Sequence, residues 1–376
     1  MADQESILLR PPLLPPSLFR TLFFAAIVAA AFLLVDTVLA NTERRETTLE
    51  AARFNLDGQS LMQQGKYAGA ADAFRAAIAN ARENPGYRLA LGEALLGAGQ
   101  LNEAGATLTE LLKSDSMAGA PNLAMARVFA KEGEFDEAAS WYHRAIYGQW
   151  KDDATGNRAR ARFELADFLA ARNSKADLLA ELLPLQEQAP RDAATQLRLA
   201  RLFVTAGAPA RAAVIFRALV HAQPGDVETR EDLAEAECTL RDFPAAQSDL
   251  IAALRLRPDD KKARQALELC DQVLNLDPLR RGLDGPERYR RSVELLQLVA
   301  DKTTECLTPG QAAASSDLID ETQAALKSHV PVTGQSAAVE TNLELAGKLW
   351  QSERTKCAST ASMDEPLQLL LSKAAP

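Results

Sequence analysis

The sequence predicts an all-α protein made of repeated helix pairs, with one apolar helix before them and a helical region after them. Alanine and leucine dominate the 376 residues, and aromatic residues contribute only 6%, as is typical of helices that pack through small side chains. A pattern of small and bulky residues returns every 34 residues over much of the chain. A single uninterrupted apolar stretch lies near the N-terminus.

The first 40 residues divide into a leader, 1–20, and an apolar segment, 21–40. The segment "TLFFAAIVAAAFLLVDTVLA" contains one charge, Asp36. As a helix it would be about 30 Å long, enough to cross the hydrocarbon core of a bilayer. Because it is apolar on every face, we expect membrane targeting rather than burial in a protein core.

Two interpretations of this segment stay open. It is either a retained transmembrane anchor or a cleaved signal that ends at "VLA", where Val38 and Ala40 supply the small residues before Asn41. The leader, with its "RPPLLPPSLFR", is long for a cleaved signal and favours the anchor.

Basic residues flank the segment on both sides, so their distribution does not fix its orientation. They are Arg10, Arg20, Arg44 and Arg45. An N-terminal signal anchor with a large domain behind it usually keeps its N-terminus in the cytoplasm. We therefore expect a single-pass protein of the inner (cytoplasmic) membrane, with the repeat domain in the periplasm or otherwise outside the cytoplasm.

Residues 51–278 carry the repeat. The segments "GKYAGAADAFRAAI", "GQLNEAGATLTELL" and "GEFDEAASWYHRAI" align at successive intervals of 34 residues. Their shared positions are Gly65, Gly99 and Gly133, then Ala70, Ala104 and Ala138, then Phe74, Leu108 and Tyr142. Further copies begin at Gly207 and Arg241, and a partial one covers 263–278. A degraded copy lies between the third and fifth, at Leu165, Ala166, Leu169, Asn173, Leu178 and Leu182.

This spacing indicates a helix–turn–helix module. Small residues such as Gly92 and Ala104 let two helices approach closely, and the glycine of the turn supplies a positive φ. Prolines such as Pro224 and Pro258 end the second helix. One pair cannot bury its own apolar face, so successive pairs must stack.

The pattern closely resembles the tetratricopeptide repeat (TPR) family over about residues 51–278. It departs from the family where Phe54 and Arg88 replace the usual first-helix tryptophan. The resemblance implies a superhelix of about six repeats plus a partial one. It also implies a scaffold rather than an enzyme, with a concave groove that binds a peptide or helix of a partner protein.

The resemblance further implies which residues line the groove, namely those on the exposed side of each first helix. They are Asn55, Gln59, Gln63, Glu93, Arg127, Lys131, Arg160, Asp167, Arg201, Glu231 and Glu235. The basic residues in the middle of this series suggest an acidic stretch or terminal carboxylate as the ligand. The alternative is that these charges only solvate the helices.

Other function classes find less support. The net charge of −9 argues against nucleic-acid binding, which needs a basic surface. The chain lacks a glycine-rich phosphate loop, a Gly-x-Ser-x-Gly elbow, a His-Glu-x-x-His and a Cys-x-x-Cys. Its three histidines are scattered, so we expect no metal and no cofactor. A structural or stabilising subunit of a membrane enzyme or transport complex is the main alternative to a scaffold. An enzyme with an unrecognised site ranks behind it.

Two aromatic residues fall outside the repeat pattern, in the insertion "YGQWKDDATGNR" at 147–158. Tyr147 and Trp150 either fill the gap that the extra loop opens or form an aromatic contact for a partner.

The C-terminal region, 279–376, is expected to hold helices at about 287–306, 317–327, 337–356 and 364–371. They would cap the repeats, or dock to lipid or an acidic partner through the arginines of "LRRGLDGPERYRR". Cys238 and Cys270 are interpreted as small core residues. Cys306 and Cys357 are either thiols or, in an exported domain, a disulfide.

Overall fold

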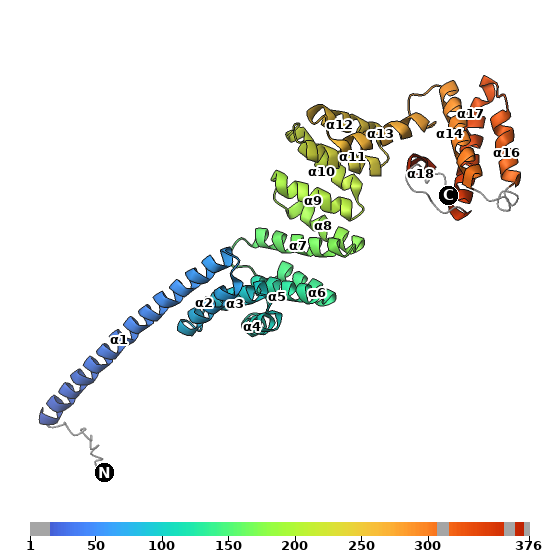
Figure 1. The fold of residues 1–376 in the computed structure, drawn as a ribbon. Coiled ribbons are helices and arrows are strands. Elements are labelled where there is room, and N and C mark those ends of the chain that lie inside the picture. Colours follow the sequence, from blue (N-terminus) through green and yellow to red (C-terminus); the bar gives the residue numbers. More distant parts are fainter. Residues whose placement is uncertain (1–15, 307–315, 357–364, 372–376) are drawn as a thin grey trace, which may run out of the picture. The chain divides into compact units, whose positions relative to one another are not determined.

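The structure, a computed structural model, describes residues 16–306, 316–356 and 365–371, which are almost entirely helical (Figure 1). The prediction of an all-α fold is therefore confirmed. The chain divides into two compact units, 1–162 and 163–376.

The first unit consists of three helix pairs and the beginning of a further helix. The second helices α2 and α4 also pack against α3 and α5, the first helices of the following pairs. The helices are α1 (Pro16–Gln63) with α2 (Tyr67–Asn80), α3 (Pro85–Gly97) with α4 (Leu101–Ser114), α5 (Gly119–Glu132) with α6 (Phe135–Tyr147), and α7 (Ala154–Ala171), which enters the second unit.

The second unit continues the alternation and then changes to longer helices. Its repeat helices are α8 (Lys175–Gln188), α9 (Ala193–Thr205), α10 (Pro209–Ala222), α11 (Val227–Thr239), α12 (Phe243–Leu256) and α13 (Lys261–Leu276). They are followed by α14 (Gly285–Cys306), α16 (Ser316–Lys327), the 3-10 turn η1 (Val332–Gly334), α17 (Gln335–Lys356) and α18 (Glu365–Leu371).

The turn inside each helix pair holds one residue in the left-handed region, as the sequence predicts for the glycines. These residues are Gly65 (φ 71°), Gly99 (φ 76°), Gly133 (φ 81°), Asn173 (φ 57°), Gly207 (φ 73°) and Arg241 (φ 61°). Asparagine tolerates this conformation better than most residues, whereas arginine is strained in it. The eroded fourth copy and the copy at Arg241 therefore keep the turn geometry of the others.

Close approach within a pair depends on the small residue of the first helix. A Cβ atom at Gly58 would lie 2.6 Å from the ring of Phe74, and one at Gly92 would lie 2.7 Å from Cδ2 of Leu108. Phe74 and Leu108 are both buried. The side chain of the second helix thus occupies the space that a first-helix side chain would need.

The helix α1 joins the apolar segment to the first repeat without a break (Figure 1). The sequence analysis separates the apolar segment 21–40 from the repeats that begin at residue 51. The intervening residues 41–50, "NTERRETTLE", contain neither glycine nor proline and are helical in the structure. The hydroxyls of Thr47 and Thr48 donate to the backbone oxygen of Arg44 within this stretch, at 3.1 and 2.6 Å. Ala51 is the first buried residue of the helix.

In the part of the chain that the structure describes, α1 is the one helix long and apolar enough to cross a membrane, with a mean hydropathy of 2.4 in its apolar window. The apolar side chains from Phe23 to Leu39 are exposed. An N-terminal signal sequence would satisfy the same criterion, so the two interpretations of this segment both remain.

The C-terminal helices form a separate core and also return to the repeats. Leu295, Leu296 and Leu349 lie in the core of α14 and α17. From α18, Leu369 packs against the core of α11, α12 and α13, and its carbonyl oxygen accepts a hydrogen bond of 2.6 Å from Arg241. The predicted helices of this region are present, with bounds that differ by two residues or fewer. The side chains of Cys306 and Cys357 lie outside the described residues, so their predicted pairing stays a prediction.

Candidate functional site

All residues predicted to line a groove lie on the first helices of their pairs. Asn55, Gln59 and Gln63 are on α1, Glu93 is on α3, Arg127 and Lys131 are on α5, Arg160 and Asp167 are on α7, Arg201 is on α9, and Glu231 and Glu235 are on α11. Most of these side chains are exposed or partly exposed. We call the surface formed by these side chains, taken separately in each unit, the first-helix face.

In the first unit, the basic residues of the first-helix face already have partners. Nη1 of Arg127 lies 3.7 Å from Oε1 of Glu93, on the neighbouring first helix. The ammonium group of Lys131 donates to the backbone oxygen of Leu96 at 3.3 Å, which places it at the C-terminal end of α3. Cations are favourable at that end of a helix.

The second unit repeats this arrangement with different residues. Arg198 pairs with Asp167, Nε of Arg201 donates to Asp232 at 2.8 Å, and Nζ of Lys262 lies 3.4 Å from Oε2 of Glu235. Each of these pairs joins one first helix to the next. The charges of the first-helix face thus form ion pairs between neighbouring modules.

The partners Arg198, Asp232 and Lys262 were missed by the sequence reasoning. The available signal was the sequence separation, because each pair joins opposite charges 27 or 31 residues apart. Arg127 and Glu93 are likewise one 34-residue period apart. Oppositely charged residues that recur near the repeat interval indicate contact between adjacent first helices.

A cavity of about 240 Å³ opens between α11, α12 and α13. Its walls are mostly apolar, and the charged residues that border it are Glu231, Glu235 and Lys262. Burial, together with the neighbouring Asp260 carboxylate, raises the pKa of Glu231. The apolar wall is formed by Ala234, Leu250, Ala263, Ala266 and Leu269, and Cys238 also lines the cavity.

The aromatic pair of the insertion divides into one packed and one exposed residue. The Trp150 ring fits against Gly119, where an added Cβ would lie 2.3 Å from the indole, and its Nε1 donates to the backbone oxygen of Ala145 at 2.9 Å. Arg160 lies over this ring, 5.9 Å from its centroid. Tyr147, in contrast, is 68% exposed.

An imidazole ring and a guanidinium group lie beside the exposed ring of Tyr147. Its ring stacks with that of His143 at 6.4 Å, and the guanidinium of Arg162 lies 5.9 Å from its centroid. Trp150 is therefore packed against neighbouring backbone, whereas the ring of Tyr147 is exposed, and a contact of either residue with a partner stays a prediction.

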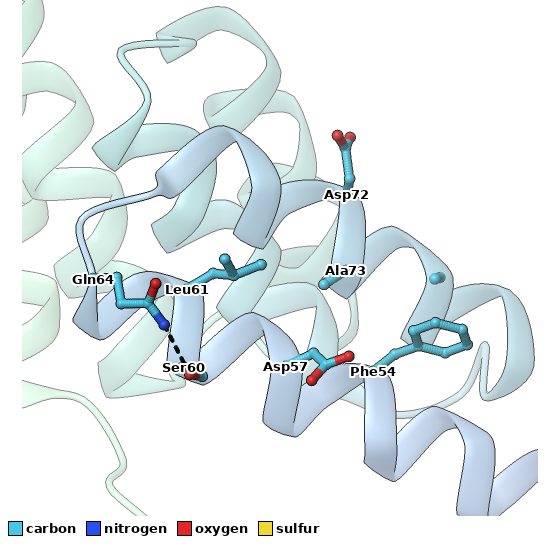
Figure 2. A pocket seen from close by; sticks show the side chains of 8 residues that line it. Phe54, Asp57, Ser60, Leu61, Gln64, Asp72 and Ala73 are labelled. Atoms are coloured by element: carbon cyan, nitrogen blue, oxygen red, sulfur yellow. Dashed lines mark hydrogen bonds between the residues drawn. The ribbon is translucent and has the colours of Figure 1, made fainter.

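A depression of about 520 Å³ lies on the first helix pair, where Phe54 and Leu61 of α1 face Ala73 of α2 (Figure 2). Polar side chains surround these apolar groups, and Nε2 of Gln64 donates to Oγ of Ser60 at 3.2 Å. Asp57 stands where the next two copies have Leu91 and Met125, both buried.

Leu91 and Met125 occupy this position in the second and third helix pairs, each of which follows another pair, and both are buried. Among the described residues no pair precedes α1 and α2, and the carboxylate of Asp57 is exposed on that face. The depression is therefore the solvated end of the repeat stack.

Among the described residues, no group of three His, Cys, Asp or Glu side chains lies close enough to hold a metal ion.

Comparison with known proteins agrees with the helix pairs. Residues 61–120, which span the second half of the first pair and the whole second pair, match the family model described as a tetratricopeptide repeat. None of the curated proteins compared with the chain matches it.

Solved structures of repeat proteins are similar at low identity. YrrB, described as a TPR protein with an unusual peptide-binding site, is 19% identical, with a TM-score of 0.42 over 53% of this chain and 99% of that one. PilF of Pseudomonas aeruginosa is 15% identical, with a TM-score of 0.42 over 59% of this chain and 97% of that one. The C-terminal part of a TPR protein from Cytophaga hutchinsonii is 18% identical, with a TM-score of 0.45 over 64% of this chain and 98% of that one.

Proposed function

We propose that the chain is a non-catalytic scaffold whose first-helix face binds a peptide or helix of a partner protein, a proposal supported by the match of residues 61–120 to the tetratricopeptide repeat model. The observation that carries this proposal is the series of polar side chains that every first helix presents, together with the 240 Å³ apolar cavity between α11 and α13. An extended or helical ligand would place apolar side chains in such a cavity and polar groups along its borders.

The ion pairs on this face mean that an acidic ligand must compete with carboxylates of the protein itself. An acidic ligand would compete with Glu93 for Arg127 and with Asp232 for Arg201. These pairs are partly exposed, so each contributes about 1 kcal/mol or less and can be exchanged at little cost. The proposed ligand therefore carries carboxylates that replace those of the protein.

The proposal is tested by crosslinking in cells followed by purification of the chain from solubilised membranes. Arg127→Glu and Arg201→Glu each place a like charge beside an acidic neighbour and repel an acidic ligand, so recovery of the crosslinked partner should fall. Arg255→Glu is the matched control, because Arg255 is exposed on a second helix, α12. Equal partner recovery from all three variants would contradict binding at the first-helix face. It would favour the alternative, a stabilising subunit that binds through other surfaces.

We further propose that α1 is retained as a single-pass anchor in the cytoplasmic membrane, with the repeats outside the cytoplasm. Its support is the exposed apolar surface, which would be costly in water, and the continuity of the helix from the span into the first pair. Intact-mass measurement of the membrane-extracted chain tests this. Retention of the N-terminal residues supports an anchor, whereas a chain that begins at Asn41 shows a cleaved signal.

A test of orientation requires a separate measurement. Protease added to intact cells whose outer barrier has been opened should digest the repeats and spare the leader. Protection of the repeats under those conditions would place them in the cytoplasm.

A further inference from the structure

Two cysteines of the second unit meet between neighbouring first helices. Cys238 lies near the C-terminal end of α11 and Cys270 lies in α13, 32 residues later. Their Sγ atoms are 3.4 Å apart. Each sulfur is therefore already in contact with the other.

The surroundings of the two sulfurs differ. Cys270 is wholly buried in the core that α11, α12 and α13 share, whereas Cys238 is partly exposed and lines the 240 Å³ cavity. A reagent in solution can thus reach Cys238 through the cavity, whereas Cys270 can be reached only by way of Cys238.

Metal binding does not account for the pair. Two sulfurs are too few for a structural zinc site, which takes four ligands. Within the described ranges, no third His, Cys, Asp or Glu lies close enough to complete such a site. The chemistry that two adjacent thiols can perform by themselves is oxidation to a disulfide.

We propose that Cys238 and Cys270 form a reversible disulfide that fastens α11 to α13 when the protein meets a small-molecule disulfide as oxidant. A disulfide bond is about 2.05 Å long, so the two sulfurs need to approach by about 1.4 Å. The Cys238 side chain lines the cavity, so we assign the movement to this side chain rather than to the buried Cys270.

The reaction balances as a thiol–disulfide exchange in two steps. The thiolate of Cys238 attacks one sulfur of the oxidant RSSR, and RS⁻ leaves and takes up the proton that Cys238 released. The thiolate of Cys270 then attacks Sγ of Cys238 and expels the second RS⁻, which takes the proton of Cys270. The two cysteines lose two protons and two electrons in all, and RSSR becomes two RSH.

The bond would act on the cavity that borders it. Its two halves belong to the first helices of adjacent pairs, α11 and α13, which both line that cavity. Oxidation therefore restrains these walls without involving α12, which joins them along the chain. This inference does not depend on the proposed function, since it concerns two side chains in contact and not a partner.

The test uses the full chain in detergent with Cys306→Ser and Cys357→Ser, which leaves Cys238 and Cys270 as its cysteines. The protein is treated with oxidised glutathione, its free thiols are alkylated, and it is digested with trypsin without reductant. Cleavage after arginine places the two cysteines in different peptides, 231–241 and 265–280. We expect one crosslinked species whose mass is the sum of these peptides less two hydrogen atoms, and its loss after dithiothreitol.

Three results would overturn the proposal. They are alkylation of both cysteines after oxidation, a glutathione adduct that persists on Cys238 beside an alkylated Cys270, and a disulfide between two chains. Because the tested pair is unsubstituted, none of these can be attributed to a misfolded variant at the site.

A second measurement tests the fastening itself. Backbone hydrogen exchange in 231–241 and 265–280 should slow on oxidation and recover on reduction. A matched Cys238→Ser chain should show no change with either reagent. Exchange that is equal in the oxidised and reduced forms would refute the restraint on α11 and α13.

Discussion

Substitution of Gly92 by alanine provides a sharp test of how the two helices of a pair approach each other. In the middle of a helix, alanine is favoured over glycine by about 1 kcal/mol, so helix propensity alone predicts that Gly92→Ala stabilises the protein. The new methyl group would, however, lie 2.7 Å from Cδ2 and 2.9 Å from Cγ of Leu108. Ordinary carbon contacts are at about 3.5–4.0 Å, and Leu108 is 0% exposed and has little room to move.

The magnitude follows from these two opposing terms. Overpacking of a close-packed core costs about 1–3 kcal/mol, so the net result for Gly92→Ala is a loss of stability of about 1 kcal/mol. Gly105 provides the matched control in the next helix, α4. A Cβ atom there meets nothing closer than 4.0 Å, so Gly105→Ala should gain about 1 kcal/mol. The propensity term cancels between the two variants, and their difference of about 2 kcal/mol measures the steric cost.

Hydrogen exchange of the α3 and α4 amides, followed by mass spectrometry, measures this difference as a change in local opening free energy. A local readout is needed because stacked repeats do not always unfold in one step. The expected result is faster exchange in Gly92→Ala and slower exchange in Gly105→Ala than in the parent chain. Equal stabilisation by both substitutions would refute the argument that Leu108 occupies the space beside Gly92.

Two further predictions concern single side chains. Burial raises the pKa of Glu237 above its ordinary 4.5 despite the bond of 2.8 Å from Arg217, so the folded chain binds more protons and its stability falls as pH rises through the raised pKa. Glu237→Gln should therefore raise the melting temperature at pH 7, and the difference should vanish below about pH 4; a lower melting temperature at pH 7 would contradict the sign. Trp150→Phe keeps a ring against Gly119 but removes the bond to the oxygen of Ala145, so urea unfolding followed by circular dichroism should show a loss of about 1 kcal/mol. An unchanged midpoint would show that this bond contributes nothing.

The sequence predicts the helix pairs because their requirements are local and periodic. A positive φ in each turn, a small residue on the first helix and a bulky one on the second recur at fixed positions, from Gly65 and Phe74 to Asn173 in the eroded copy. Each requirement involves residues close in sequence, so a single chain displays it. The same reasoning locates the C-terminal helices, whose apolar spacing is also local.

The candidate site was harder to predict from the sequence, because it depends on which side chains face each other across neighbouring helix pairs. The interval between Arg201 and Asp232 is 31 residues and that between Cys238 and Cys270 is 32, so neither follows the strict period of 34. A shift of two or three positions moves a side chain by most of a helical turn. Interpreting each residue alone therefore gave Arg201 as a groove residue for an acidic ligand and Cys238 and Cys270 as core residues, whereas the contacts between them depend on how the helices pack.

The continuity of α1 has a geometric consequence for the first helix pairs. From Ala40, at the end of the apolar segment, to Ala51, the first buried residue, the helix rises about 16 Å. In a membrane-anchored chain, this stretch sets the distance of the first pairs from the membrane. It also sets their heading, which is the direction in which they point around the axis of α1, because each residue turns a helix by about 100°. Removal of one residue from 41–50 would rotate the first pairs by about 100° around the axis of α1. Removal of seven would lower them by about 10 Å yet return them almost to the original heading. If α1 is retained as an anchor, the number of residues in 41–50 thus sets both the distance of the first pairs from the membrane and the direction in which they point.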